Sequence, residues 1–276
     1  MKLFCIIQGP LISYGQGPNN VKKGFQTSKS ILENICTLKK YNIDYLYVTW
    51  HPKNINEINE LKFLTEKNIN YTLLKSPNVI DPDHRFKHHY SIKSALDFIK
   101  IENYDYLMKI RSDQVFTSEC INSLIMRNTD KLIVSELMNN NSFYVGDFIY
   151  FAKTKVFIEF IYSQLTKRYF LHPVIANDIG FKYYLAKTKK SYITTLYIYF
   201  FLHKKSFKNW ELFIYNNIET IKSKDWENIL WRDKKISSII SSSPFYFTDS
   251  KKLNHKILNL KIYIRGLFTY IRKVYA

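Results

Sequence analysis

The segment from Lys109 to Asp113, with the sequence KIRSD, places two cations and a carboxylate at the end of an apolar run. An open α/β sheet binds its ligands at the carboxyl ends of its strands, so charged side chains at such an end are candidates for a binding site. A carboxylate there can hold a divalent cation against a diphosphate, and a guanidinium can contact two phosphate oxygens at once. Lys109, Arg111 and Asp113 would share one face if the strand continued through them. The alternative interpretation is a salt bridge at the end of a strand.

Two acids later in the chain are candidates for the proton acceptor in a transfer reaction. A transfer to a hydroxyl group needs a carboxylate near that hydroxyl to take its proton. Asp147 follows Gly146 at an expected strand end, and Asp178 begins an expected helix. We take Asp147 and Asp178 as the catalytic candidates, although an acid in the first turn of a helix is also favoured by the helix dipole alone.

The loop that ends near Phe86 and the start of the expected third helix contain Asp83, His84, Arg85, His88 and His89. These residue types can bind metal, but they lie on a loop broken by proline and lack a zinc-binding spacing. We expect Arg85 and His89 to face a phosphate group. The alternative is a solvent-exposed turn, where such residues usually lie.

Strand and helix patterns alternate along the first half of the chain. Short apolar or β-branched runs are typical of buried strands, and apolar residues at helical spacing follow them. This alternation predicts an α/β fold with a mainly parallel central sheet flanked by helices, of the Rossmann-like type. The expected strands are 2–7, 44–50, 71–74, a run within 104–116 that breaks off at 111–113, and 131–137, with a strand or hairpin over 142–153. The expected helices begin near 28, 56 and 88.

The second half of the chain is dominated by helical patterns, near 154–168, 174–188 and 209–222. The apolar stretch 191–203 is shorter than the roughly 18 residues that a membrane span needs. The tail 251–276 has seven Lys or Arg residues and no acid, interleaved with apolar residues. Such a basic amphipathic helix is typical of a membrane surface, and the alternative is a final helix packed on the domain. We predict a domain over 1–190 and a helical C-terminal region over 191–276.

Composition narrows the classes of function. The net charge of +18 raises nucleic acid, anionic membrane or a polyanionic substrate as partners, unless it reflects composition bias alone. The three cysteines have no CxxC spacing, which argues against a disulfide framework or a zinc site. The N-terminal apolar run lacks the features of a signal peptide, so we expect a cytoplasmic location.

Four short motifs resemble the WavE-type family of bacterial lipopolysaccharide-synthesis proteins. They are QGP at Gln8–Pro10, Thr49 with Trp50, KIRSD at Lys109–Asp113 and VGD at Val145–Asp147, and they cover about the first 150 residues in family order. The resemblance implies a glycosyltransferase with a nucleotide-sugar-binding fold of the A type.

The resemblance also implies roles for particular residues. Asp113 stands where this fold keeps the second acid of an Asp-x-Asp motif, which usually contacts the metal. Arg111 replaces the first acid, so a Mn²⁺ or Mg²⁺ cofactor is expected only as an option. Trp50 is expected at the rim of the donor pocket. The other residues expected at the nucleotide sugar are Gln8, Gly9, Pro10, Lys109, Arg111 and Ser112.

We therefore expect a glycosyltransferase that uses a nucleotide-sugar donor to build a bacterial cell-surface polysaccharide, such as lipopolysaccharide, lipooligosaccharide or capsule. The acceptor would be a glycan or a lipid-linked intermediate. The basic tail would hold the enzyme at the anionic inner face of the cytoplasmic membrane. Two alternatives stay open: a basic nucleic-acid-binding protein, which lacks a recognised module here, and a non-catalytic relative that acts as a scaffold in polysaccharide assembly.

Overall fold

The computed structural model describes residues 1–14, 24–78, 85–135, 145–165, 179–191, 209, 212–221, 225 and 229–236. Several predictions lie outside these residues: the catalytic candidate Asp178, the loop residues Asp83 and His84, most of the apolar stretch 191–203 and the basic tail 251–276. The side chain of Arg85 is likewise outside the described set.

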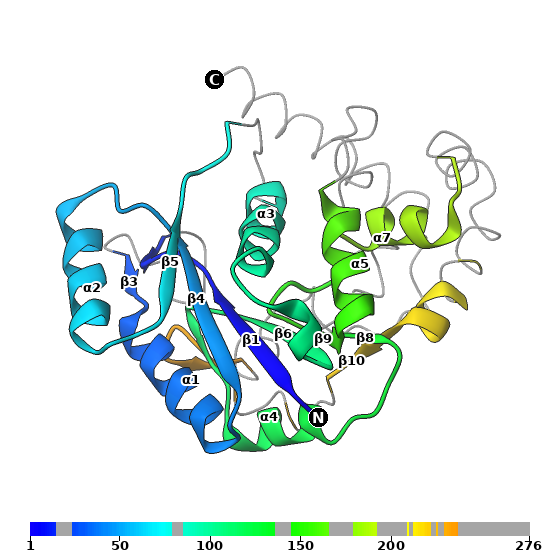
Figure 1. Cartoon of the computed structure of the whole chain (residues 1–276), viewed down its shortest axis with the longest axis horizontal. Coiled ribbons are helices and arrows are strands. Elements are labelled where there is room, and N and C mark those ends of the chain that lie inside the picture. The colour runs from blue at the N-terminus through cyan, green and yellow to red at the C-terminus, as the bar shows by residue number, and fades with distance from the viewer. Residues whose placement is uncertain are drawn as a thin grey trace.

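A seven-stranded sheet forms the centre of the molecule (Figure 1). Its strands lie in the order β10-β8-β9-β6-β1-β4-β5, and β9 runs antiparallel to both neighbours, while the other pairs are parallel. The predicted α/β fold with a mainly parallel sheet is therefore confirmed. The strands are β1 (Leu3–Gln8), β4 (Asp44–Trp50), β5 (Tyr71–Leu74), β6 (Tyr106–Arg111), β8 (Leu132–Val134), β9 (Ile149–Lys153) and β10 (Ile218–Thr220).

The central strand β1 shows why this sheet is covered on both sides. All six of its residues are buried. Phe4 and Ile6 belong to one hydrophobic core, and Cys5 and Ile7 belong to the other. A strand that buries both faces has a continuous apolar sequence rather than an alternating one, as LFCII does.

Helices form the two outer layers. Residues of α1, α2 and α4 pack in one core, and residues of α3, α5 and α7 pack in the other. Figure 1 shows α1 and α4 on one side of the sheet and α3, α5 and α7 on the other. The bounds are α1 (Ser28–Lys40), α2 (Ile55–Glu66), α3 (Arg85–Leu96), α4 (Ser118–Ile125), α5 (Thr154–Gln164) and α7 (Ile179–Thr188), with a 3₁₀ turn, η1, over Ile101–Asn103.

Two small sheets lie beside the ends of the central strands. One pairs β2 (Ile12–Ser13) with β3 (Phe25–Gln26). The other joins β7 (Gln114–Val115) to a hairpin made of β11 (Leu230–Trp231) and β12 (Lys234–Lys235). This hairpin brings the C-terminal part of the chain against the segment that directly follows Asp113.

The C-terminal region differs from the prediction. Residues 209 and 212–217 are helical, as expected for 209–222, but 218–220 form strand β10, which pairs with β8 at the edge of the central sheet. The domain boundary at residue 190 stays a prediction, because most of 191–276 lies outside the described residues. Helical periodicity and a short edge strand are hard to tell apart when the strand has three residues. Within the described residues no helix is long and apolar enough to cross a membrane.

Candidate functional site

A cavity of about 530 Å³ opens at the carboxyl ends of the parallel strands β1, β4 and β6. The order of strands along the sheet reverses between β1 and β6, and ligands of open α/β sheets bind at such a point. Gln8, Trp50 and Arg111 end these three strands and line the cavity. The predicted residues that line it are Gln8, Gly9, Pro10, Trp50, Arg111, Asp113 and Asp147.

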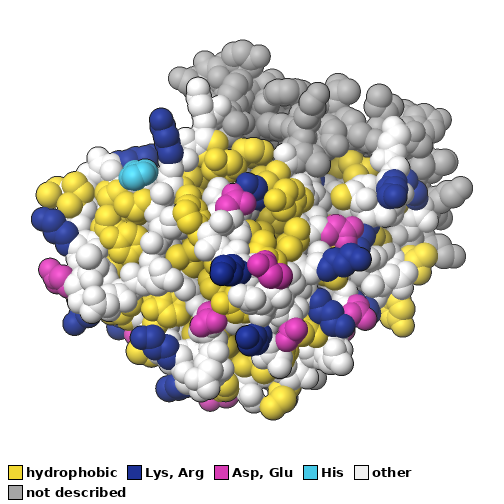
Figure 2. Space-filling model, in the orientation of Figure 1, with side chains coloured by type: hydrophobic (Ala, Val, Ile, Leu, Met, Phe, Trp, Pro, Cys, Tyr) yellow, Lys and Arg dark blue, Asp and Glu magenta, His cyan; other side chains and the backbone are white. Residues whose placement is uncertain are grey.

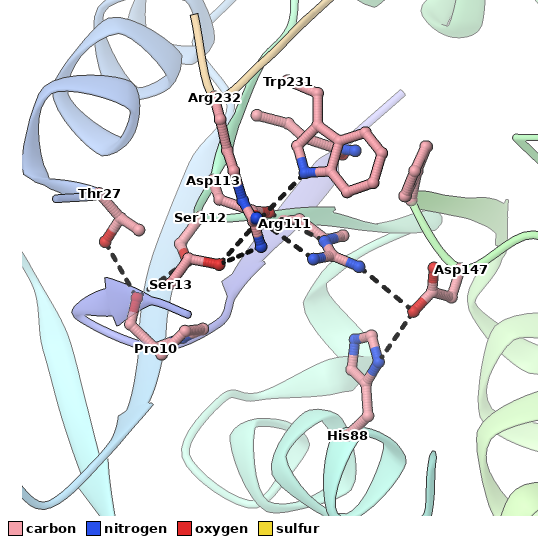
Figure 3. A network of polar contacts seen from close by, with 12 residues as sticks. Pro10, Ser13, Thr27, His88, Arg111, Ser112, Asp113, Asp147, Trp231 and Arg232 are labelled. Atoms are coloured by element: carbon pink, nitrogen blue, oxygen red, sulfur yellow. Dashed lines mark hydrogen bonds and ion pairs between the residues drawn. The ribbon is translucent and has the colours of Figure 1, made fainter. Parts of the chain in front are cut away.

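Asp113 is the centre of a buried polar network on one wall of this cavity (Figure 3). Arg111 donates to both carboxylate oxygens, from Nε to Oδ1 at 2.9 Å and from Nη2 to Oδ2 at 3.1 Å. Oδ2 also accepts from Ser13 Oγ at 3.0 Å and from Trp231 Nε1 at 3.1 Å. Arg232 Nε completes the network at 3.2 Å from Oδ2. Two guanidinium groups thus share one carboxylate.

The surroundings of Asp113 do not fit a divalent cation. Burial would raise the pKa of this carboxyl, but the charge and hydrogen bonds of Arg111, with those of Trp231 and Arg232, lower it well below its usual range. A carboxylate offers about four acceptor positions, and five donor atoms already point at Asp113. Among the described residues no group of three or more His, Cys, Asp or Glu side chains could hold a metal. The metal role predicted for Asp113 stays untested, and we derive no step through a metal.

Trp231 and Arg232 are site residues that sequence reasoning missed. Arg232 lies in the two-residue turn of the β11–β12 hairpin, and its backbone N–H donates to the carbonyl of Asp113 at 3.0 Å. Its Nη2 also donates to Ser13 Oγ at 2.8 Å. The signal in the sequence is weak: the segment LWRDKKI has polar residues between apolar ends, which allows a hairpin, but nothing local links it to a residue more than a hundred positions earlier.

Asp147 lies on the opposite wall and contacts both Arg111 and His88. Its Oδ2 lies 3.5 Å from Arg111 Nη1 and 3.3 Å from His88 Nδ1. Burial would raise the pKa of this carboxyl, but the charge of Arg111 and the hydrogen bond from His88 lower it well below its usual range. Asp147 is therefore ionised at neutral pH, and Arg111 bridges the two acids of the site.

His88 is neutral at physiological pH. Burial lowers its pKa to about 4, and the charges of Lys109 and Arg111 act in the same direction, against the opposing effect of Asp147. When the ring donates from Nδ1 to Asp147, Nε2 is left as an acceptor. This Nε2 is buried and has no hydrogen-bond partner in the described structure. Because Nε2 is enclosed, it is not open to a hydroxyl group in the cavity, and the hydrogen bond from Nδ1 orients the carboxylate of Asp147.

Lys109 does not line the cavity. Its side chain is fully buried, and Nζ donates to the backbone carbonyl of Asp147 and lies 4.9 Å from the ring centroid of Tyr150. Lys109 and Arg111 thus both reach Asp147 from one face of β6, as the alternation predicted. The strand ends at Arg111, however, and a turn through Ser112 and Asp113 returns the carboxylate toward Arg111.

Gly9 and Ser112 shape the wall of the cavity. Gly9 has a φ of +154°, and a β-carbon at this position would overlap Ser112 Oγ. The hydroxyl of Ser112 donates to the carbonyl of Pro10 at 3.1 Å, and Thr27 Oγ1 donates to the same oxygen at 2.9 Å. Ser112 is buried and does not line the cavity, so in this structure it supports the loop after β1 rather than facing a ligand. The absence of a β-carbon at Gly9 serves this close backbone packing.

His89 faces the core, contrary to its predicted contact with the donor. It is buried, its ring stacks on Tyr150 at a centroid distance of 5.8 Å, and Nε2 lies 3.3 Å from the Tyr150 hydroxyl. Ile92, three residues later on α3, is also in the core, so helical geometry puts both side chains on the same face. The neighbouring His88 lines the cavity instead.

Comparisons with known proteins give no family assignment. No protein family and no curated protein matches the chain, so the WavE-type resemblance is not confirmed. Among solved structures, a putative glucose-1-phosphate thymidylyltransferase from Bacillus anthracis has 12% identity and a TM-score of 0.39, over 90% of this chain and 98% of its own. A glycosyltransferase involved in glycosylation of the major capsid of PBCV-1 has 10% identity and a TM-score of 0.39, over 70% and 76%. The inositol-1-phosphate CTP transferase from T. maritima has 13% identity and a TM-score of 0.39, over 68% and 81%.

Proposed function

We propose that this chain is a glycosyltransferase that binds a nucleotide sugar in the cavity at the ends of β1, β4 and β6. The observation that carries the proposal is the arrangement of two groups around one cavity. Arg111 and Arg232 bring two guanidinium groups together at Asp113, and the His88–Asp147 pair lies beside them. The first group suits a diphosphate, and the second suits removal of a proton.

The donor would lie across the point where the strand order reverses. Its diphosphate would lie against Arg111 and Arg232. Gln8 and Trp50, at the ends of β1 and β4, would border the nucleoside. The sugar would then extend toward Asp147.

In the transfer step, an acceptor hydroxyl oxygen forms a bond to the anomeric carbon of the sugar. The bond from that carbon to the diphosphate oxygen breaks, and its electron pair leaves with the nucleoside diphosphate. The cations at the phosphate stabilise the negative charge that develops there. The carboxylate of Asp147, which lines the cavity, takes the hydroxyl proton, and the hydrogen bond from His88 Nδ1 holds this carboxylate in position.

The polysaccharide acceptor rests on sequence observations. The motifs that resemble the WavE-type family and the basic tail 251–276 support a glycan or lipid-linked acceptor at an anionic membrane surface. A nucleic-acid partner has less support. On the face drawn in Figure 2, the Lys and Arg side chains of the described residues are interspersed with Asp and Glu rather than gathered in a continuous patch.

A thermal-shift screen of nucleoside diphosphates and nucleotide sugars, with and without Mn²⁺ or Mg²⁺, tests the proposal. A ligand that binds only the folded state raises the melting temperature by mass action. We expect one nucleotide series to raise the melting temperature. With the matching nucleotide sugar, the protein should slowly release nucleoside diphosphate, and Asp147→Asn should reduce that rate. The proposal is wrong if no nucleotide shifts the melting temperature. Binding without release in any donor and acceptor combination would favour the scaffold alternative.

A further inference from the structure

Arg111, Arg232 and Asp113 form one hydrogen-bonded cluster that lines the cavity. We propose that the diphosphate of the donor is bound directly by Arg111 and Arg232, which Asp113 holds in position, and that this binding needs no divalent cation. The inference rests on the proposed function, because it names how the same cavity binds the phosphates of its donor.

The hydrogen bonds of Asp113 bear on whether it could bind a metal ion. A carboxylate binds a divalent cation through oxygen lone pairs that are open to it. Both oxygens of Asp113 accept hydrogen bonds, and Oδ2 alone accepts from four donor atoms. The residue as a whole is 1% exposed. Asp113 is therefore a positioning residue for the two arginines.

The charges of the side chains around Asp113 and Asp147 favour an anionic ligand. Among the described residues, Arg111, Arg232 and the buried Lys109 face the two carboxylates of Asp113 and Asp147, which is three positive charges against two negative ones. A cluster that is cationic before any ligand arrives attracts a diphosphate and repels a further cation. A guanidinium also offers five donors in a planar fork that matches phosphate oxygens.

The backbone conformation at Arg232 is unusual for an arginine. Arg232 has a φ of +50° and Asp233 a φ of +64°, the values of a two-residue hairpin turn in which glycine and asparagine are preferred. Arg232 is 4% exposed and lines the cavity, whereas Asp233 is exposed. An arginine in this conformation is strained, and such strain persists where the side chain has a function.

The turn supplies a matched pair of variants. Arg232→Asn removes the guanidinium but puts a residue that tolerates positive φ into the turn, so the hairpin is kept. Asp233→Asn makes a similar change at the neighbouring position, away from the cavity. Arg232→Lys keeps the charge without the planar fork, and it serves as a second variant if Arg232→Asn does not fold by near-ultraviolet circular dichroism.

Isothermal titration of the full chain tests the proposal, with inorganic pyrophosphate and the nucleoside diphosphate from the screen as probes. Each titration is run in excess EDTA and again with Mn²⁺. We expect both probes to bind in EDTA, with affinities within a few-fold of those in Mn²⁺. Loss of a charged hydrogen bond predicts that Arg232→Asn and Arg111→Gln weaken binding by about tenfold or more in EDTA. Asp233→Asn should bind like the unmodified protein, and Arg232→Lys should fall between the two.

The outcomes separate this inference from the proposed function. Binding that appears only with Mn²⁺ and is lost in Asp113→Asn would overturn the inference and leave the proposed function standing. Unchanged affinity in Arg232→Asn or in Arg232→Lys would overturn it too. A protein that binds neither probe with or without Mn²⁺ would contradict both.

Discussion

His88 Nδ1 lies 3.3 Å from Asp147 Oδ2, and this contact joins helix α3 to the segment that precedes β9. The two side chains come from segments that are separated by β6 and β8 in the chain. Because Arg111 also contacts the same carboxylate, the histidine belongs to the charged cluster at the end of β6. Both the stability and the chemistry of the site should therefore depend on the charge of His88.

The protonation of His88 predicts how stability depends on pH. An unfolded histidine binds a proton near pH 6.5, whereas folded His88 binds one near pH 4. Between these values the unfolded state holds more protons, so His88 makes the free energy of unfolding fall as the pH decreases from 6.5 to 4. The total loss is about 3 kcal/mol, and it levels off below pH 4.

Urea unfolding of the unmodified protein and of His88→Gln, at several pH values from 7 to 4, measures this effect. His88→Gln should flatten the pH dependence in that window, because titrating groups that do not contact His88 contribute equally to both proteins. Equal slopes in the two proteins would show that His88 is not held neutral in the folded state.

Gly9→Ala should destabilise the fold by about 2 to 3 kcal/mol, because it adds both an unfavourable φ and a steric overlap. The overlap is with Ser112 Oγ, so the double variant Gly9→Ala with Ser112→Ala should recover part of the loss. Denaturant unfolding of the two single variants and the double variant measures the coupling. Additive effects would mean that the two residues do not oppose each other in this way.

Trp231→Phe should lower the free energy of unfolding by about 1.5 kcal/mol, because it removes a hydrogen bond to a charged acceptor. The aromatic ring remains to pack against Phe148, whose centroid lies 4.9 Å away. Denaturant unfolding measures the loss. Trp50→Phe is the comparison, since no side-chain hydrogen bond of Trp50 occurs in the described structure. This substitution should lower the free energy of unfolding by less than Trp231→Phe does. The reverse order would contradict the role given to the indole N–H.

Asn34→Ala should cost about 2 to 4 kcal/mol, because it leaves two buried backbone groups without partners. Asn34 Nδ2 donates to the carbonyl of Gln114 at 2.6 Å, and its Oδ1 accepts from the N–H of Phe116 at 2.9 Å. These bonds hold α1 against the strand that follows Asp113. Cys36→Ala, at an exposed position of the same helix, is the control for denaturant unfolding and should change little. Similar losses in the two variants would contradict this account.

The sheet was largely predictable from the sequence, and particular residues show why. Residues 44–50 and 71–74 form β4 and β5 with the bounds expected, because apolar and β-branched runs between turn signals are characteristic of buried strands. The position of the site at the end of β6 followed from the charges that end this strand. The β11–β12 hairpin was missed, because its strands have two residues each and its pairing with β7 is set by tertiary contacts.

The errors at the site have definite physical reasons. His89 was assigned to the donor, although the apolar residue three positions later, Ile92, indicates that His89 is on the core side of α3. Arg232 lies 119 residues from its partner Asp113, and no periodic pattern connects positions that far apart. The prediction that Lys109, Arg111 and Asp113 share one face holds for Lys109 and Arg111, because the strand ends at Arg111.

A crystal structure of the full chain with a bound nucleoside diphosphate tests the central claim most directly. The measurement is the position of the two phosphate groups. We predict phosphate oxygens within hydrogen-bond distance of the guanidinium groups of Arg111 and Arg232, with the nucleoside beside Gln8 and Trp50. A nucleotide bound away from the ends of β1, β4 and β6, or a cavity that stays empty at saturating nucleotide, would contradict the claim.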